Sequence, residues 1–202
     1  MRAWIALIAP GDSALRAFFD NTSNANPGSR GGAILNAGTM LIDSSTFTGS
    51  RARGFGGAIA GREGVATTVT GSTFSGNASI LGGDSFTLGP QFSVSRSIVE
   101  NCDTPVISTG DNIGKDSSCF PSSTALNDRV NLDPGLVALA DNGGPTKTMA
   151  LLSGSPAIDQ VIVNAATCSG TDQRGVARPL GVRCDIGAFE LDSDPIFANG
   201  FE

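Results

Sequence analysis

Short runs of β-branched and polar residues alternate with glycine turns along the first 130 residues. The segments 41–47 and 65–74 are typical, because each is rich in Thr, Ser and branched apolar residues and ends on a phenylalanine. Runs of this length and composition predict short strands, whereas apolar positions at helical spacing are scarce in this part of the chain. The pattern therefore predicts an all-β fold.

Two markers repeat along this part of the chain at nearly the same interval. The phrase Gly-Gly-Ala-Ile begins at residues 31 and 56, and a degraded copy begins at residue 82. A second phrase has an apolar residue three positions before a polar one, and its copies lie 24 to 29 residues apart, at Phe18, Phe47, Phe74 and Ile98. Two independent markers with one period indicate a solenoid, in which each unit buries its apolar side only by stacking on its neighbours. We therefore predict a parallel β-helix with one coil per repeat.

The repeated residues have structural roles in this prediction. The four apolar markers should point inward and stack along the axis, each stabilising the fold by about 1.5–3 kcal/mol through burial. Three asparagines occupy the polar position of the phrase: Asn21, Asn77 and Asn101. Asparagine tolerates the left-handed backbone of a sharp turn, and identical amides on successive coils are able to form a ladder. The glycine pairs allow bends and a close approach of neighbouring backbones.

Different phrases follow after Asn101. Ala-Asp-Asn-Gly-Gly-Pro-Thr occupies residues 140–146, and Asp-Gln-Arg-Gly-x-x-Arg-Pro occupies residues 172–179. These phrases closely resemble the C-terminal module of bacterial pectate-lyase-like β-helix proteins, the group called choice-of-anchor Q. The upstream Gly-Gly-Ala-Ile and Phe-x-x-Asn phrases resemble polymorphic outer membrane protein repeats. Together the resemblances cover about residues 18–190. They imply a right-handed parallel β-helix that is secreted or held at the surface of a Gram-negative-type bacterium, with no established enzymatic activity.

We expect three parts in the chain. Residues 1–130 should form the coils, residues 131–190 an irregular C-terminal capping or anchor module, and residues 191–202 a tail. The apolar start at residues 1–9 fits either a short signal-peptide core or a strand of a chain that begins within the repeats. The last residues, 194–202, resemble a short ending of exported proteins from some gammaproteobacteria, and fit either a sorting signal or a frayed final strand.

The C-terminal module has the residues to cover an open end of the solenoid. Unpaired strand edges invite edge-to-edge association, and an irregular, proline-containing, acidic segment is a suitable cover. Five charged residues are expected to form an ion-pair network that ties this cap: Asp172, Arg174, Arg178, Asp185 and Glu190.

Four cysteines are present: Cys102, Cys119, Cys168 and Cys184. Four cysteines allow three pairings, and the local one, Cys102 with Cys119 and Cys168 with Cys184, would close two short loops worth about 3 kcal/mol each. No two of them form a Cys-x-x-Cys pair, so we expect disulfides and an oxidising compartment rather than a zinc or redox site.

Composition excludes several kinds of chemistry. The chain has no histidine, so it has no Ser-His-Asp or Cys-His nucleophile and no imidazole zinc site. A net charge of −6 with 13 basic residues argues against nucleic-acid binding. No apolar stretch reaches the roughly 18–20 residues that a spanning helix needs. We expect no catalytic residue, no cofactor, no metal ligands and no transmembrane segment.

Three functions remain in competition. The first is a non-catalytic extracellular or surface-exposed β-helix, an adhesin-like or passenger-like scaffold whose partner is a polysaccharide or a host or cell-surface ligand. The second is a polysaccharide lyase, a glycoside hydrolase or a carbohydrate-binding module, since lyases of this shape use an Arg or Lys base and hydrolases use paired carboxylates. Its candidate residues are Arg51, Arg53, Arg62 and Arg96, with Asp43, Glu63, Asp84 and Glu100. The third is a flat threonine face for an ordered surface such as ice, formed from Thr46, Thr48, Thr68, Thr70 and Thr73.

Overall fold

The described part of the chain consists of strands, isolated bridges and turns. A computed structural model describes residues 16–23, 28–83, 86–87, 91–121, 126–162 and 168–192. Within these ranges all pairs between named strands are parallel, and no α-helix is present. The all-β prediction is confirmed at this level, with parallel strands.

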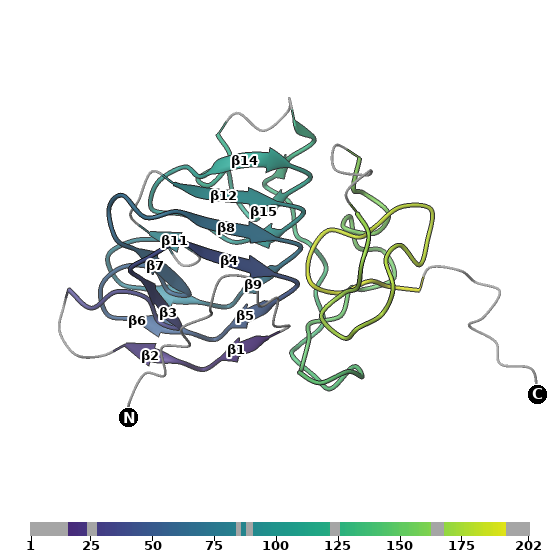
Figure 1. Cartoon of the computed structure of the whole chain (residues 1–202), viewed down its shortest axis with the longest axis horizontal. Helices are drawn as coiled ribbons and strands as arrows, with labels where there is room; N and C mark the ends of the chain where they lie inside the picture. The colour runs from purple at the N-terminus through teal and green to yellow at the C-terminus, as the bar shows by residue number, and fades with distance from the viewer. Residues whose placement is uncertain are drawn as a thin grey trace, which may run out of the picture.

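The strands form four sheets. Figure 1 shows the strands of each sheet one above another, beside a region without strands. The six-stranded sheet contains β1 (Ala17–Phe19), β5 (Thr46–Thr48), β9 (Thr73–Ser75), β13 (Ile98–Val99), β15 (Ile113–Gly114) and β16 (Arg129–Val130). One three-stranded sheet contains β2 (Thr22–Ser23), β6 (Arg51–Ala52) and β10 (Ala78–Ser79), and the other contains β3 (Ile34–Asn36), β7 (Ile59–Gly61) and β11 (Phe86–Thr87). The four-stranded sheet contains β4 (Met40–Asp43), β8 (Thr67–Thr70), β12 (Phe92–Ser95) and β14 (Ile107–Gly110).

The order of the strands explains the sequence repeat. The chain visits the six-stranded sheet, the two three-stranded sheets and the four-stranded sheet in the same order three times, from β1 to β12. Each strand of one pass pairs with its counterpart in the next pass, as Ile34 pairs with Ile59 and Met40 with Thr67. From β13 onward the passes shorten, because no later strand in the described part of the chain belongs to a three-stranded sheet. We use "the stack" for these superposed passes.

Three of the four apolar markers line up inside the stack. Phe18 pairs in register with Phe47, and Phe47 with Phe74. Their rings lie parallel, with centroids 4.6 Å apart in both pairs. Phe47 and Phe74 are completely buried. The repeat therefore places one aromatic side chain above another at the spacing of adjacent strands.

The prediction that Ile98 continues this column is wrong. Ile98 pairs with Thr73, so Val99 follows Phe74 in the interior of the stack. Ile98 points to the other face of the sheet, where it joins a second apolar cluster with Ile113 and Ile186. The cause is a shift of one residue, which exchanges the two faces of a strand.

The asparagines also act differently from the prediction. The left-handed position of the turn belongs to the preceding residue, Asp20 (φ 53°) or Gly76 (φ 70°), and not to Asn21 or Asn77. The buried side chain of Asn77 instead accepts a hydrogen bond from the Ser50 amide (3.1 Å) and donates one to the Phe47 carbonyl oxygen (3.0 Å). Its role is to join two passes.

A polar ladder follows the corner between the four-stranded and six-stranded sheets. Its members are Ser45, Ser72, Ser97, Asn112 and Asp128, all buried. In each step the backbone amide of one pass donates to the side-chain oxygen of the next pass, over 3.0 to 3.2 Å. The residue before each member has a positive φ: Ser44, Gly71, Arg96, Asp111 and Asn127. The ladder satisfies buried amides that have no strand partner at the corner.

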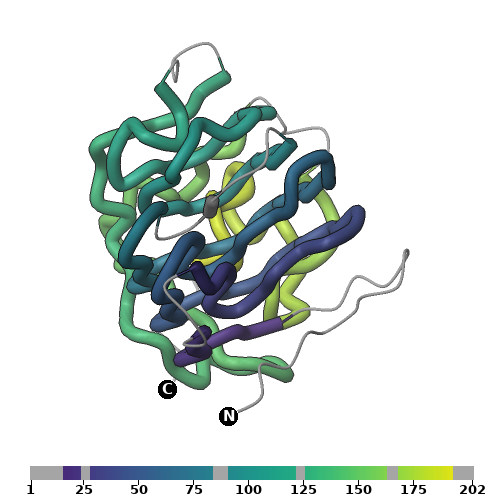
Figure 2. The backbone as a smooth tube through the Cα atoms, turned by 90° about the vertical axis from the view of Figure 1, so that its left-hand side faces the viewer, coloured from purple at the N-terminus to yellow at the C-terminus, as the bar shows by residue number. Residues whose placement is uncertain are grey.

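We call residues 131–190 the C-terminal segment. Its described parts, 131–162 and 168–190, pack along the side of the stack. The two views place this segment beside the strands and not over the ends of the passes (Figures 1 and 2). The hydroxyl of Thr46 donates to the side-chain oxygen of Gln173 (2.6 Å), and that of Thr73 accepts from the amide of Ala188 (3.0 Å). The segment therefore covers the outer face of the six-stranded sheet, which differs from the expected cap over open strand edges.

Two disulfides are present, and they follow the local pairing. Cys102 is bonded to Cys119 within the stack, and Cys168 to Cys184 within the C-terminal segment. All four cysteines are buried. Each bridge therefore fixes one of the two apolar clusters from within.

Some expectations fall on residues outside the described ranges. They are the apolar start at 1–9, the ending at 194–202 and the candidate Asp84. Among the described residues, no helix has the length and apolar character needed to cross a bilayer.

Candidate functional site

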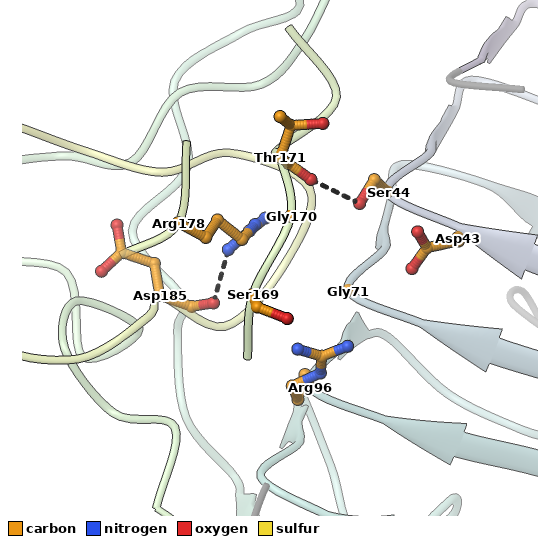
Figure 3. Close-up of a pocket in the computed structure, with 9 residues that line it drawn as sticks. All are labelled: Asp43, Ser44, Gly71, Arg96, Ser169, Gly170, Thr171, Arg178 and Asp185. Atoms are coloured by element: carbon orange, nitrogen blue, oxygen red, sulfur yellow. Dashed lines mark hydrogen bonds between the residues drawn. The ribbon is translucent and has the colours of Figure 1, made fainter. Parts of the chain in front are cut away.

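A polar cavity lies where the stack meets the C-terminal segment. Its volume is about 290 Å³. Asp43 at the end of β4 and the corner residues Ser44, Gly71 and Arg96 form one wall, as Figure 3 shows. The other wall comes from the C-terminal segment: Ser169, Gly170, Thr171, Arg178 and Asp185. We call this cavity the seam pocket.

The backbone of the corner places Arg96 in this pocket. Arg96 follows β12 and has a φ of 49°, which turns the chain from the four-stranded sheet toward the six-stranded sheet. Its amide donates to the Gly110 carbonyl oxygen (3.0 Å), and its own carbonyl oxygen accepts from the Gly187 amide (2.9 Å). Arg96 is thus fixed on one side by the next pass and on the other by the C-terminal segment.

Burial shifts the ionisation of both charged residues on the stack side. The pKa of Asp43 is raised by burial, against the opposing effect of the positive charges of Arg96 and Arg178. The pKa of Arg96 is lowered by burial and by repulsion from Arg178, against the opposing effect of Asp43 and Asp111. The two arginines therefore repel each other across a partly desolvated space.

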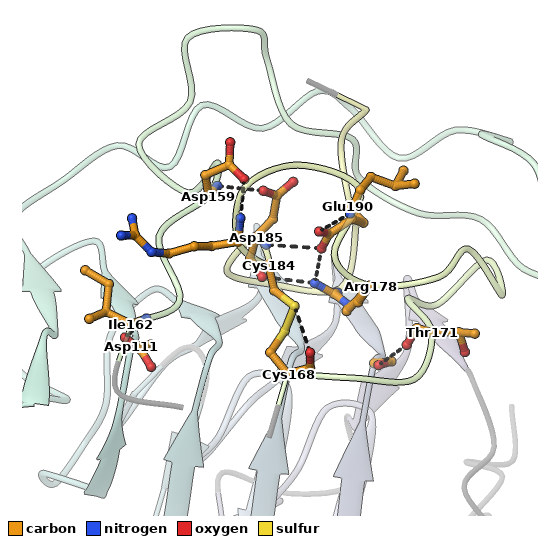
Figure 4. Close-up of a disulfide and its surroundings, with 12 residues drawn as sticks. Asp111, Asp159, Ile162, Cys168, Thr171, Arg178, Cys184, Asp185 and Glu190 are labelled. Carbon is orange, nitrogen blue, oxygen red and sulfur yellow. Dashed lines mark hydrogen bonds and ion pairs between the residues drawn. A yellow bond between two sulfur atoms is a disulfide. The ribbon is translucent and has the colours of Figure 1, made fainter. Parts of the chain in front are cut away.

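Arg178 is the buried centre of the opposite wall. Its guanidinium donates to the backbone oxygens of Asp185 (3.0 Å) and Gly187 (2.6 Å), and it forms an ion pair with Glu190 at 2.6 Å. Glu190 also accepts the amides of Leu180 (3.1 Å) and Asp185 (3.1 Å). These bonds hold the loop around Arg178 in one conformation (Figure 4).

The expected ion-pair network is formed by four of its five residues. Arg174 contacts Asp172 at 2.7 Å, and Arg178 contacts Glu190 as described above. Asp185 contributes in a different way, because its carboxylate accepts the amides of Leu191 (2.6 Å) and Asp159 (2.8 Å). Burial raises the pKa of Asp185 to about 7. Its carboxylate points away from Arg96 in Figure 3.

The other candidate catalytic residues do not gather at this pocket. Arg51, Arg53, Arg62 and Glu63 are exposed. Glu100 lies near Lys115 at 3.8 Å, beside a second cavity of about 310 Å³. Of the described residues among those proposed for sugar chemistry, the structure brings together only Asp43 and Arg96. Ser44, Ser169 and Thr171 carry no sequence signal for this site, since small polar residues are common throughout the chain.

The regular threonine columns of the third hypothesis are not formed. Thr46 and Thr73 are buried beneath the C-terminal segment. Thr68 is exposed, but its neighbours in the same column of the four-stranded sheet are Leu41 and Ser93. The outer face of that sheet is therefore chemically mixed.

Within the described ranges, no group of three or more Cys, Asp or Glu side chains is arranged to hold a metal ion. Comparisons with protein-family models, with curated proteins and with solved structures find no match.

Proposed function

We propose that the chain is a right-handed parallel β-helix that serves as a non-catalytic extracellular or surface-exposed scaffold, adhesin-like or passenger-like, of a Gram-negative-type bacterium. Three passes through the sheets in one order, with strands paired in parallel from pass to pass, support the β-helix. The phrases at 140–146 and 172–179 support the choice-of-anchor type of C-terminal module.

The observation that carries the scaffold proposal is that the charged side chains of the C-terminal segment are bonded to the segment's own backbone. Asp172, Asp185 and Glu190 are at most 2% exposed, and each carboxylate accepts backbone amides of its own segment. Both arginines of the network also donate to backbone carbonyl oxygens. Charges used in this way fix loop conformation and are not available to transfer protons to a substrate.

The two disulfides support the proposed location. Bonds of this kind persist in oxidising compartments, outside the cytosol. One bridge cross-links the stack, which also has the aromatic column and the polar ladder, and the other cross-links the C-terminal segment; such cross-links resist unfolding at a cell surface. The proposed partner is a polysaccharide or a host or cell-surface ligand.

A second candidate is a polysaccharide-active or carbohydrate-binding module. The observation that favours it is the seam pocket, because Asp43 and Arg96 were both candidates for this chemistry and line the same cavity. A lyase of this kind would use arginine as its base.

One experiment separates the two proposals. The purified chain with its disulfides intact is applied to a glycan array and incubated with a panel of acidic and neutral polysaccharides, while unsaturated and reducing ends are measured. The scaffold proposal expects no new ends with any polymer. Product release that is lost in Asp43→Asn and kept in the exposed control Glu63→Gln would overturn it in favour of the enzyme.

A further inference from the structure

Arg96 occupies a corner position that its residue type does not favour. Of the five corner residues of the polar ladder, Gly71, Asp111 and Asn127 belong to types that adopt a positive φ readily. Arginine has no such preference, and neither has the serine at Ser44, so the corner imposes a strained backbone on Arg96 that a role of its side chain would explain. The stack would accept a smaller residue here, as it does in the neighbouring passes.

The side chain of Arg96 adds a second unfavourable feature. It is partly buried, and it faces the seam pocket, which Arg178 lines from the opposite wall (Figure 3). Burial is the main cause that lowers the pKa of Arg96, and repulsion from Arg178 adds to it, against the opposing effect of Asp43 and Asp111. An anion between them would remove this repulsion and gain charge-assisted hydrogen bonds from both sides.

Arg178 has donors for such an anion. A guanidinium has five N–H donors, and the bonds to Asp185, Gly187 and Glu190 use three of them within the described part of the chain. Those bonds also keep the guanidinium in place before a ligand arrives, so little ordering is needed on binding.

Asp43 and the hydroxyl groups narrow the chemistry of the ligand. Asp43 lies on the stack wall of the same cavity, so its carboxylate would repel a dianion but accept hydrogen bonds from hydroxyl groups. Ser169 adds a hydroxyl on the opposite wall. A cavity of about 290 Å³ has room for one small molecule.

We propose that the seam pocket binds a small hydroxylated monocarboxylate, with its carboxylate between Arg96 and Arg178 and its hydroxyl groups donating to Asp43. The ligand bridges the stack and the C-terminal segment. This site is additional to the scaffold function, so its failure leaves the scaffold proposal unchanged.

Thermal unfolding of the full chain with D-gluconate as the probe tests this site, and calorimetric titration gives the affinity. Sodium chloride at matched ionic strength and neutral D-glucose are the controls. The wild-type melting temperature is expected to rise with gluconate and not with glucose. Arg96→Asn, which suits the left-handed corner, should melt at or above the wild-type temperature without ligand and bind gluconate at least about tenfold more weakly. Arg62→Asn, an exposed arginine away from the pocket, should keep the wild-type response.

A second variant tests the role of Asp43. Asp43→Asn removes the negative charge of the stack wall, so the dianion D-glucose 6-phosphate should now stabilise the chain, although it has little effect on the wild type. Three results would each overturn the proposal. The first is the absence of titratable gluconate binding to the wild type, and the second is an unchanged gluconate response in Arg96→Asn. The third is equal stabilisation of the wild type and of Asp43→Asn by D-glucose 6-phosphate.

Discussion

Phe47→Ala removes the central member of the aromatic column, and its effect can be worked out from the geometry. Phe47 is completely buried and has a parallel ring 4.6 Å away on both sides, Phe18 below and Phe74 above. Truncation of a buried phenylalanine to alanine costs about 3–5 kcal/mol in lost burial and cavity formation. Since two stacked contacts are lost, we expect a value in the upper half of this range. The pass above and the pass below are both affected.

Two neighbouring residues make this prediction specific. Among the described residues Phe18 is an end member of the column with one stacked neighbour, so Phe18→Ala should cost clearly less than Phe47→Ala. Phe19→Ala lies in the same strand as Phe18, but Phe19 is 46% exposed, and its truncation should cost less than about 1 kcal/mol. Urea unfolding with the disulfides intact, followed by far-ultraviolet circular dichroism, measures all three. A cost for Phe47→Ala no greater than that for Phe19→Ala would refute the stacked interior.

Three further predictions concern the ladder, the buried carboxylates and the disulfides. Ser72→Ala should lower the free energy of unfolding by about 1–3 kcal/mol, because it leaves the buried amide of Ser45 without its acceptor. Urea unfolding measures this change, and an unchanged free energy of unfolding would contradict the ladder. The pKa of Asp185 is raised in the folded chain to about 7, so the folded state binds more protons than the unfolded state between about pH 4 and 7, and stability should fall as the pH rises through this window. Unfolding measured across pH should show this slope, and Asp185→Asn should reduce it, with the remainder due to Asp43, Asp128 and Glu190, whose pKa values burial also raises. An unchanged slope in the variant would contradict the contribution of Asp185. Replacing Cys168 and Cys184 by serine should destabilise the chain by about 3 kcal/mol, as a calorimetric melt of the double variant should show, whereas an unchanged melt would exclude a stabilising bridge.

The sequence was sufficient for the class of fold and for part of the core. The period of the phenylalanines and glycines predicted parallel strands that recur about every 25 residues, and Phe18, Phe47 and Phe74 lie in register as expected. The prediction was wrong at Ile98. The repeat marker was defined by an apolar residue three positions before a polar one, and it ignored how far that apolar residue lies from the corner. Counting from the corner aligns Ser72-Thr73-Phe74 with Ser97-Ile98-Val99 and puts Val99 inside.

The seam pocket could not be predicted from the sequence, for a related reason. Asp43 and Arg96 come together with residues more than 70 positions away, and that meeting depends on where the C-terminal segment lies. A solenoid repeat specifies which side chains share a column, but it does not specify which column a separate segment will cover. The expectation of a cap was based on the general tendency of unpaired strand edges to associate. It contained no information about which outer face of the stack the segment would cover.

The column that starts with Thr46 contains the missing information. Read from pass to pass, the outward positions of the six-stranded sheet are Thr46, Thr73, Ile98, Ile113 and Arg129. Two adjacent outward isoleucines are unfavourable on a solvent-facing sheet, so the face that bears them must be covered. The two are indeed buried against apolar residues of the C-terminal segment, while the threonines beside them bond to Gln173 and Ala188. An apolar pair in an outward column is therefore the local signal for side-on packing, and it can be read once the register is counted from the corners.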